Sequence, residues 1–464
     1  MAITKCLDFT NQAFQLGFFT LAHVVPQAPC EKPTSLWVLN DLITTCHTLS
    51  CPQNPRRYRP VPAPLCNNVK LWEDLPFVAF CRHACSTLFP AVRIAVLAHI
   101  RHAIAEPFSG GMEAHCDMLC HGLRAEGHEV DLFAADGSSD PGLVPICEAP
   151  YDEVLPWRIY RGTGELAKYQ RTAFERALLR IGSGHYDVVH NNSLFPEIID
   201  WCASAGIPCV TSQHVPPFGA MFEAVKRNCD RANIATTVTS SDQQVLWSER
   251  GCDETEVVPN GIDTDRWTST SETGDYFTWI GRIVPNKGLA EAVQAATLAK
   301  VRLKIFGPVE DAAYFAKSVE PYLRDGIEFH GHRSAKYLQP EVARARGALV
   351  TPLWDEPFGL VAAEALACGT PVAGFDRGAL PEVVGDCGLL VKAGNISGLA
   401  KAIGRIGVIN RSQCRDRALR KLSIGAMIGG YEACYAKVVA GARLASLPRL
   451  AWASSCSRTT ELLA

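Results

Sequence analysis

The chain has 464 residues, of which 47% are hydrophobic and 20% are charged, ordinary values for a globular protein with a sizeable core. Its formal net charge of −3 provides no overall basic field for a nucleic acid or an acidic membrane surface. No apolar run reaches the roughly 18 residues of a membrane-spanning helix. The longest candidate, residues 14–26, contains Gln15 and His23. We therefore expect neither a nucleic-acid partner nor an integral membrane segment.

Residues 1–91 differ from the rest of the chain. They are rich in Pro and Cys and have no sustained helical or strand period. The cysteines form no Cys-x-x-Cys zinc pair and follow no convincing signal peptide, so we expect inert thiols in a reducing cytoplasm. We expect this segment to be disordered or not translated, because an alternative start codon can encode Val92. A stable native product that contains Met1, detected by mass spectrometry, would exclude the second option.

Clear order begins at residues 92–99, a continuous apolar run typical of a buried parallel strand. The next element is a predicted helix, Met112–Glu126. Its apolar face carries Met112, Cys116, Leu119 and Leu123, and its polar face carries Glu113, Asp117, His121 and Arg124. Further strands are predicted at 129–135, 186–190, 207–213 and 232–240. Strands that alternate with helices form a parallel sheet covered on both faces, so residues 92–260 predict a Rossmann-like lobe.

A second series of strands follows the turn at residues 259–263. These strands are predicted at 276–282, 301–307, 326–331, 347–353 and 370–375. The expected fold class is therefore α/β, with two doubly wound lobes. Their predicted extents are 92–260 and 261–422, followed by a closing helix at 423–440 and a disordered tail at 441–464. Open α/β sheets bind ligands at the carboxyl ends of their strands, so the cleft between the lobes is the predicted site.

The loop "GRIVPNKG", residues 281–288, follows the first strand of the second lobe. Gly281 allows the backbone to approach a ligand closely, and Arg282 and Lys287 supply two cations beside a helix start. This combination suits a phosphate group. The spacing is not that of a P-loop. The alternative interpretation is two solvated surface cations.

The stretch "WDEPFGLVAAEALACGTPVAG" places Glu356 before an apolar helix and Glu364 inside it. A buried carboxylate without a partner is costly, so both need one. Pro357 suits the first helical position, which would leave Glu356 at the cap and the first amides of the helix free for a ligand. We interpret the missing partners as hydroxyl groups, of a sugar at Glu356 and of a ribose at Glu364. The alternative is a cap carboxylate and a surface glutamate.

Two weaker signals lie in the first lobe. Gly110 and Gly111 stand at a helix start, where backbone can approach an anion. His214 follows the strand at 207–213 and is expected beside the cleft. Each signal alone is more often structural than functional.

Together and in this order, the Gly-Gly loop, the cleft histidine, the Gly-Arg-x4-Lys-Gly loop and the Glu-x7-Glu stretch resemble the retaining glycosyltransferases of family 4, which have the GT-B fold. The resemblance covers residues 92–440 and implies that 92–260 form the acceptor-side lobe and 261–422 the nucleotide-sugar-binding lobe. It implies that Arg282 and Lys287 hold the phosphates of a nucleotide sugar. It also implies that Glu356 contacts the transferred sugar and Glu364 the ribose.

The resemblance further implies that the two glycines line the donor phosphates or the acceptor and that the histidine lies beside the reacting sugar. The implied catalytic residues are His214, Arg282, Lys287 and Glu356. The implied donor-binding residues are Gly110, Gly111, Gly281, Arg282, Lys287, Glu356, Phe358, Gly359, Leu360 and Glu364.

The implied reaction is hexosyl transfer with retention from a nucleotide sugar, UDP-glucose by default and GDP-mannose as the alternative. No cofactor and no metal are expected. Asp263 and Asp265 match the Asp-x-Asp pattern of metal-binding transferases, but no acidic cluster lies nearby, so we expect a structural role. The base should depend on residues 330–336. The acceptor, which could be a sugar, a lipid-linked compound or another small molecule, should depend on loops 99–111 and 191–197. A lipid acceptor would allow peripheral membrane contact through basic residues.

Three other functions share this architecture. A sugar-nucleotide 2-epimerase and a phosphorylase of GT-B fold would use similar phosphate contacts, and product analysis separates them from a transferase. A non-catalytic binding protein is disfavoured because all the charged positions are present. A dehydrogenase is disfavoured because no Gly-x-Gly-x-x-Gly follows a strand.

Overall fold

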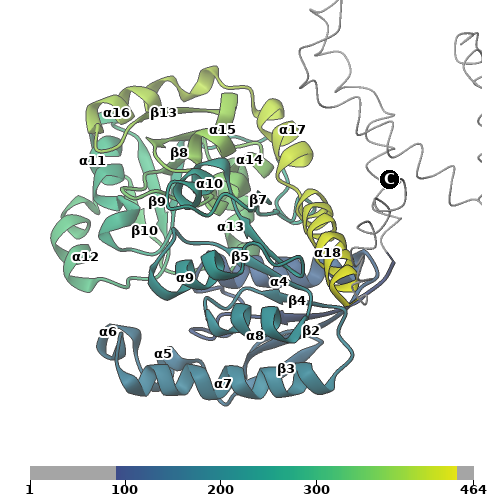
Figure 1. The fold of residues 1–464 in the computed structure, drawn as a ribbon. Coiled ribbons are helices and arrows are strands. Elements are labelled where there is room, and N and C mark those ends of the chain that lie inside the picture. Colours follow the sequence, from purple (N-terminus) through teal and green to yellow (C-terminus); the bar gives the residue numbers. More distant parts are fainter. Residues whose placement is uncertain (1–89, 447–464) are drawn as a thin grey trace, which may run out of the picture. The chain divides into compact units, whose positions relative to one another are not determined.

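The computed structural model describes residues 90–446, with side chains described up to residue 444. This part of the chain contains one parallel sheet of seven strands and one of six, each flanked by helices (Figure 1). The predicted α/β fold with two Rossmann-like lobes is confirmed. The predictions for residues 1–89 and 447–464 lie outside the described residues. Among the described helices, none combines the length and the apolar character needed to cross a membrane.

The first lobe is built on a sheet of order β3-β2-β1-β4-β5-β6-β7. Strand β1 lies inside this sheet, between β2 and β4, and is buried from Ile94 to Leu97, as its unbroken apolar run predicts. The strands are β1 Arg93–Leu97, β2 Glu129–Ala135, β3 Leu143–Cys147, β4 Val188–Asn191, β5 Cys209–Gln213, β6 Ile234–Val238 and β7 Thr255–Val257. The helices are α4 Gly111–Ala125, α5 Tyr151–Val154, α6 Trp157–Tyr160, α7 Gly164–Ser183, α8 Glu197–Ala205, α9 Gly219–Asn228 and α10 Ser241–Ser248.

The second lobe has the sheet order β10-β9-β8-β11-β12-β13, again entirely parallel. Its strands are β8 Tyr276–Ile280, β9 Arg302–Phe306, β10 Ile327–Phe329, β11 Gly347–Val350, β12 Val372–Asp376 and β13 Gly388–Lys392. Its α-helices are α11 Leu289–Ala299, α12 Ala312–Ser318, α13 Ala335–Arg344, α14 Leu360–Ala367, α15 Leu380–Val384, α16 Ile396–Arg405 and α17 Arg411–Lys421. Short 3-10 turns are η2 Pro285–Lys287, η3 Glu320–Tyr322, η4 Gly385–Cys387 and η5 Ile406–Val408.

The last helix, α18 Ile424–Ser446, follows the second lobe in sequence but packs on the first, beside α4 and β5 (Figure 1). Tyr431 and Tyr435 are fully buried there in the same core as Ile94 and Leu119. The first lobe is therefore not complete at residue 260, because its core needs this helix. The predicted boundary at residue 440 is wrong: residues 441–446 continue the helix and are not part of a disordered tail.

Candidate active site

A cavity of about 510 Å³ lies at the carboxyl ends of the strands, with walls from both lobes. All of the residues that the sequence singled out for donor binding or catalysis line this cavity. They are Gly110, Gly111, His214, Gly281, Arg282, Lys287, Glu356, Phe358, Gly359, Leu360 and Glu364. The chain thus brings together segments that are up to about 250 residues apart, as the rule for ligand sites in open α/β sheets predicts.

Side chains at the two glycines of the Gly-Gly loop would make tight contacts. A Cβ atom on Gly110 would lie 3.0 Å from Glu113 Oε2, and one on Gly111 would lie 3.1 Å from Leu360 Cδ1 of the other lobe. The backbone of Gly110 is extended (φ −164°), so its glycine is explained by space and not by backbone strain. This loop therefore marks the place where the two lobes approach each other.

His214 is 9% exposed and follows β5 directly. Its Nε2 lies 3.0 Å from Asn192 Oδ1, an atom that only accepts, so Nε2–H donates and Nδ1 is the acceptor atom of the ring. The ring of the buried His115 lies 4.2 Å away, between centroids. Burial lowers the pKa of His214 to about 4, so the imidazole is neutral at pH 7. It can bond a hydroxyl group but cannot supply a positive charge.

Both cations of the "GRIVPNKG" loop already have carboxylate partners. Lys287 Nζ donates to Glu356 Oε2 at 2.6 Å, and Trp354 Nε1–H donates to the same oxygen at 2.9 Å. Arg282 Nη1 donates to Glu310 Oε2 at 3.1 Å. The partner that Glu356 requires is therefore Lys287 in the ligand-free protein. Each ion pair places a cation and a carboxylate within the same cavity wall.

The loop before α14 corrects one prediction. Pro357 is not the first helical residue, because α14 begins at Leu360, after Gly359 in the left-handed region (φ 92°). The Pro357 carbonyl instead accepts hydrogen bonds from Thr239 Oγ1 (2.7 Å) and Ser240 Oγ (2.8 Å) of the first lobe. The loop that carries Glu356 is thus fixed to the opposite lobe, and the free amides of the helix start lie three residues later than expected.

Glu364 lies on α14 and lines the cavity. Burial raises its pKa to about 8, and the more distant charge of Arg266 opposes this only in part. At neutral pH this carboxyl group is therefore mostly protonated. A protonated carboxyl group can both donate and accept hydrogen bonds, and its ribose partner stays a prediction.

The segment predicted to recognise the base forms another part of the wall. His332, Arg333 and Ala335 of this segment, residues 330–336, line the cavity together with Phe306. The His330 ring stacks on Phe306, with centroids 5.2 Å apart.

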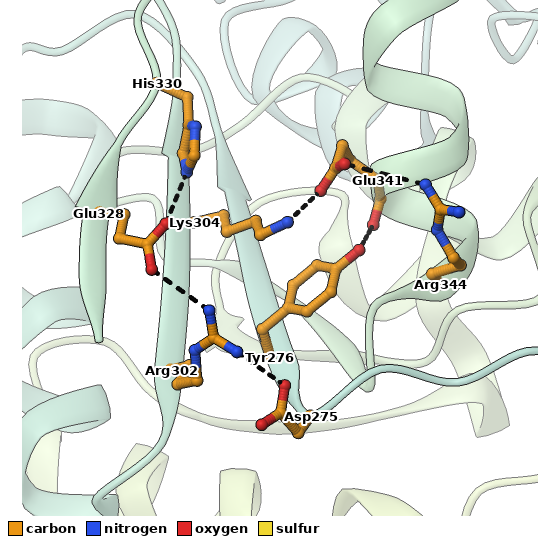
Figure 2. Close-up of polar contacts among 8 residues, drawn as sticks. All are labelled: Asp275, Tyr276, Arg302, Lys304, Glu328, His330, Glu341 and Arg344. Atoms are coloured by element: carbon orange, nitrogen blue, oxygen red, sulfur yellow. Dashed lines mark hydrogen bonds and ion pairs between the residues drawn. The ribbon is translucent and has the colours of Figure 1, made fainter. Parts of the chain in front are cut away.

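His330 is held by a chain of polar contacts across the second-lobe strands, which Figure 2 shows. Its Nε2 lies 3.2 Å from Glu328 Oε2, and Arg302 bonds both Glu328 and Asp275. This chain fixes the ring that backs the cavity wall.

A second set of contacts in Figure 2 holds helix α13, which follows the predicted base-recognition segment. Lys304 Nζ donates to Glu341 Oε2 at 2.5 Å, and Tyr276 Oη donates to the Glu341 carbonyl at 3.0 Å. Lys304 also lies 4.0 Å from the centre of the Tyr276 ring. Helix and sheet are thereby fixed beside the cavity.

The Asp-x-Asp motif, Asp263 and Asp265, takes part in hydrogen bonds within its own turn. Asp263 Oδ1 accepts hydrogen bonds from the backbone N–H groups of Asp265 and Arg266, a turn that the side chain stabilises. Over residues 90–444, no group of three or more His, Cys, Asp and Glu side chains is arranged to hold a metal ion.

Comparison with known proteins agrees with this geometry. The family model described as "Glycosyltransferase Family 4" matches residues 109–266, and the model described as "Glycosyl transferases group 1" matches residues 274–407. The chain belongs to glycosyltransferase family 4. The two models divide at the junction between the lobes, so each lobe of this family 4 glycosyltransferase is matched by its own model.

Relatives of this glycosyltransferase include proteins named D-inositol 3-phosphate glycosyltransferase. The one from Mycobacteroides abscessus is 29% identical over 431 residues, which cover 81% of this chain and 96% of that protein. The one from Mycolicibacterium smegmatis is 29% identical over 367 residues, covering 68% and 83%. These relatives match the chain over both lobes.

Two solved structures share the fold. Sucrose-phosphate synthase from Thermosynechococcus elongatus is 20% identical, with a TM-score of 0.62 over 75% of this chain and 99% of that one. AviGT4, a glycosyltransferase involved in avilamycin A biosynthesis, is 22% identical, with a TM-score of 0.57 over 75% and 98%. At these identities the likeness supports the GT-B architecture alone.

The cavity residues of this glycosyltransferase that were not predicted from sequence as site residues include Trp354, Glu310 and Glu113. Trp354 bonds Glu356, and Glu310 bonds Arg282. Glu113 was assigned to the polar face of its helix, but it is only 5% exposed and lines the cavity. The sequence did contain a signal for Glu310. It follows the end of a predicted strand, where open α/β sheets bind ligands. For Glu113 no such signal existed, because the helical period placed it on the polar face of its helix.

Proposed function

We propose that this enzyme transfers a hexosyl group from a nucleotide sugar to a hydroxyl group of an acceptor, with retention of the anomeric configuration. The observation that carries the proposal is the convergence of Arg282 and Lys287 with Glu356 and Glu364 on one cavity. Two cations suit a diphosphate, and two carboxyl groups suit the hydroxyls on either side of it. UDP-glucose is the first candidate donor and GDP-mannose the second.

The donor diphosphate would bind between Arg282 and Lys287. Both cations are held by carboxylates, and the side chains of the Lys287–Glu356 pair are 21% and 16% exposed. A diphosphate that enters shares or replaces Glu310 and Glu356 as the partners of these cations. Because the site is partly shielded from water, the preorganised charges stabilise the leaving phosphate strongly as its bond to the sugar breaks.

The sugar and the ribose would occupy opposite sides of the diphosphate. Released from Lys287, Glu356 can accept hydrogen bonds from sugar hydroxyls, and Glu364 can accept them from the ribose. His214 contributes a neutral ring beside the sugar. The leaving phosphate accepts the proton of the acceptor hydroxyl on the face from which it departs, which retains the configuration. This scheme assigns no step to a metal ion, so EDTA should leave the activity unchanged.

For the acceptor we propose a phosphorylated polyol of the kind named in the relatives, D-inositol 3-phosphate. The first-lobe wall of the cavity supports this with Arg101 and His102, which lie in the predicted acceptor loop. A guanidinium group suits a phosphate.

The test is a thermal-shift screen with UDP, GDP and ADP, followed by calorimetric titration. A ligand that binds only the native state raises its stability, by about 2.7 kcal/mol at one hundred times its Kd. We expect one diphosphate to raise the melting temperature by several degrees and Arg282→Ala to abolish the shift. If none of the three nucleotides binds the wild-type protein, the proposed function is wrong.

A further inference from the structure

Glu113 is a buried carboxyl group in the cavity that neither the phosphate contacts nor the sugar contacts use. It is the third residue of α4, is 5% exposed and lines the first-lobe wall. Its Oε2 lies directly against Gly110, so the glycine loop leaves room for this carboxyl group. The first-lobe wall of the cavity also includes His99, His102 and Tyr151.

Glu364 of the same cavity also has no ion pair among the described residues, but other carboxylates in or beside the cavity have cationic partners. Glu356 pairs with Lys287, Glu310 with Arg282, and Asp152 with Arg101 at 3.4 Å. No ion pair forms to Glu113 from any side chain of residues 90–444.

Burial raises the pKa of Glu113, against the smaller opposing influence of its own backbone N–H and of the charges of His102, Arg282 and Arg101. A carboxyl group held in a cavity without an ionic partner is costly to the empty protein. Such a cost is typical of a group that a ligand satisfies.

The chemistry of Glu113 selects its ligand. A carboxylate accepts hydrogen bonds from hydroxyl groups and repels phosphates, so the donor diphosphate is an unsuitable partner. The donor cations lie on the second lobe, whereas Glu113 lies on the first, where Trp157 adds an aromatic surface to the same cavity. A carboxyl group beside aromatic rings suits a compound with several hydroxyl groups.

Building on the proposed function, we propose that Glu113 binds hydroxyl groups of the acceptor and orients the one that attacks the sugar. The acceptor is therefore a polyhydroxylated compound, a sugar or a cyclitol, with or without a phosphate on Arg101. Glu113 is thus a residue that determines acceptor specificity, and it takes no part in holding the donor.

The test compares Glu113→Gln with Asp117→Asn, a matched control one turn further along the same helix and outside the cavity wall. The acceptor probes are D-inositol 3-phosphate, myo-inositol and D-glucose, with the donor identified in the nucleotide screen. We expect Glu113→Gln to raise the acceptor KM at least tenfold. The donor KM and the slow hydrolysis of the donor without acceptor should stay within twofold, and the control should alter none of these values.

Melting temperature separates this role from a structural one. Because the glutamine needs no ionisation in the buried site, the ligand-free Glu113→Gln variant should melt at or above the wild-type temperature. Glu113→Asp, which keeps the charge on a shorter side chain, should raise the acceptor KM to an intermediate extent. A variant that melts well below wild type would assign Glu113 to the fold and overturn the inference.

Three other results would overturn it. They are an unchanged acceptor KM, an increase in the donor KM in place of the acceptor KM, and a wild-type enzyme that binds its nucleotide but transfers to no polyol. The last result leaves the proposed transferase function standing. A wild-type protein that binds no nucleotide would instead remove that function.

Discussion

Replacing Lys287 by alanine should lower kcat about a hundredfold or more, the largest effect that we expect from a single substitution in the second lobe. Removal of one preorganised charge donor at a developing anion costs about 3–4 kcal/mol in the transition state. The substitution also deprives the half-buried Glu356 of its 2.6 Å partner and leaves it only the indole N–H of Trp354. Arg282→Ala should have an effect of similar size.

The measurement is the steady-state rate of nucleotide release for the wild type and the variants. Lys317→Ala, which removes an exposed lysine of α12 in the same lobe, is the control and should leave kcat unchanged. Lys287→Arg keeps the charge but not the geometry, so its kcat should fall between those of the wild type and the alanine variant. A kcat for Lys287→Ala within threefold of wild type would remove Lys287 from the leaving-group site.

Replacing Glu364 by glutamine should stabilise the ligand-free protein at alkaline pH and weaken nucleotide binding. The pKa of Glu364 is raised from its ordinary value of 4.5 to about 8. Between these two values the unfolded chain has released the proton and the folded protein has not, so the contribution of Glu364 to stability falls as the pH rises through this window. Above pH 8 the loss is complete and amounts to a few kcal/mol at most.

A glutamine side chain does not titrate, so the Glu364→Gln variant avoids this loss of stability. Its free energy of unfolding should equal that of the wild type near pH 4.5 and exceed it at pH 8.5, whereas Glu320→Gln, at an exposed position of the same lobe, should follow the wild type throughout. If ribose hydroxyls bond the ionised carboxylate, the variant should lose about tenfold or more in nucleotide affinity. Wild-type binding at pH 7 should release a proton. A wild type and variant with parallel pH profiles would contradict the raised pKa of this group.

The sheet interiors could be predicted from sequence because strands buried on both faces are continuous apolar runs. The residues of β2, Glu129–Ala135, were predicted without error. Three strands were missed, and all lie at sheet edges: β3, which contains Pro145, β7, which has only three residues, and β13. Edge strands have one neighbour and need less apolar sequence, so their pattern is weak.

Contacts between distant segments could not be predicted in the same way. A closing helix was predicted near α18, but its packing on the first lobe depends on side chains such as Tyr431 that meet a core with residues up to more than 300 positions earlier. Equally, the helical period of α4 placed Glu113 on a polar face. That period contains no information about the cavity that this face borders, so it could not predict that Glu113 is buried there.

Part of the candidate site was also predictable, for a chemical reason. Arg282, Lys287, Glu356 and Glu364 are charged residues at strand ends or in an apolar helix, positions where charge is costly without a partner. Their partners were not predictable. The Lys287–Glu356 pair joins residues 69 positions apart, and it exists because β8 and β11 are neighbours in the sheet, which brings the loops after them together.

The most direct test of the whole account is a crystal structure of this glycosyltransferase with its nucleotide sugar bound. We expect Arg282 and Lys287 on the diphosphate, Glu356 released from Lys287 and bonded to the sugar, and Glu364 on the ribose hydroxyls. A diphosphate bound away from Arg282 and Lys287, with the Lys287–Glu356 pair still closed, would contradict it.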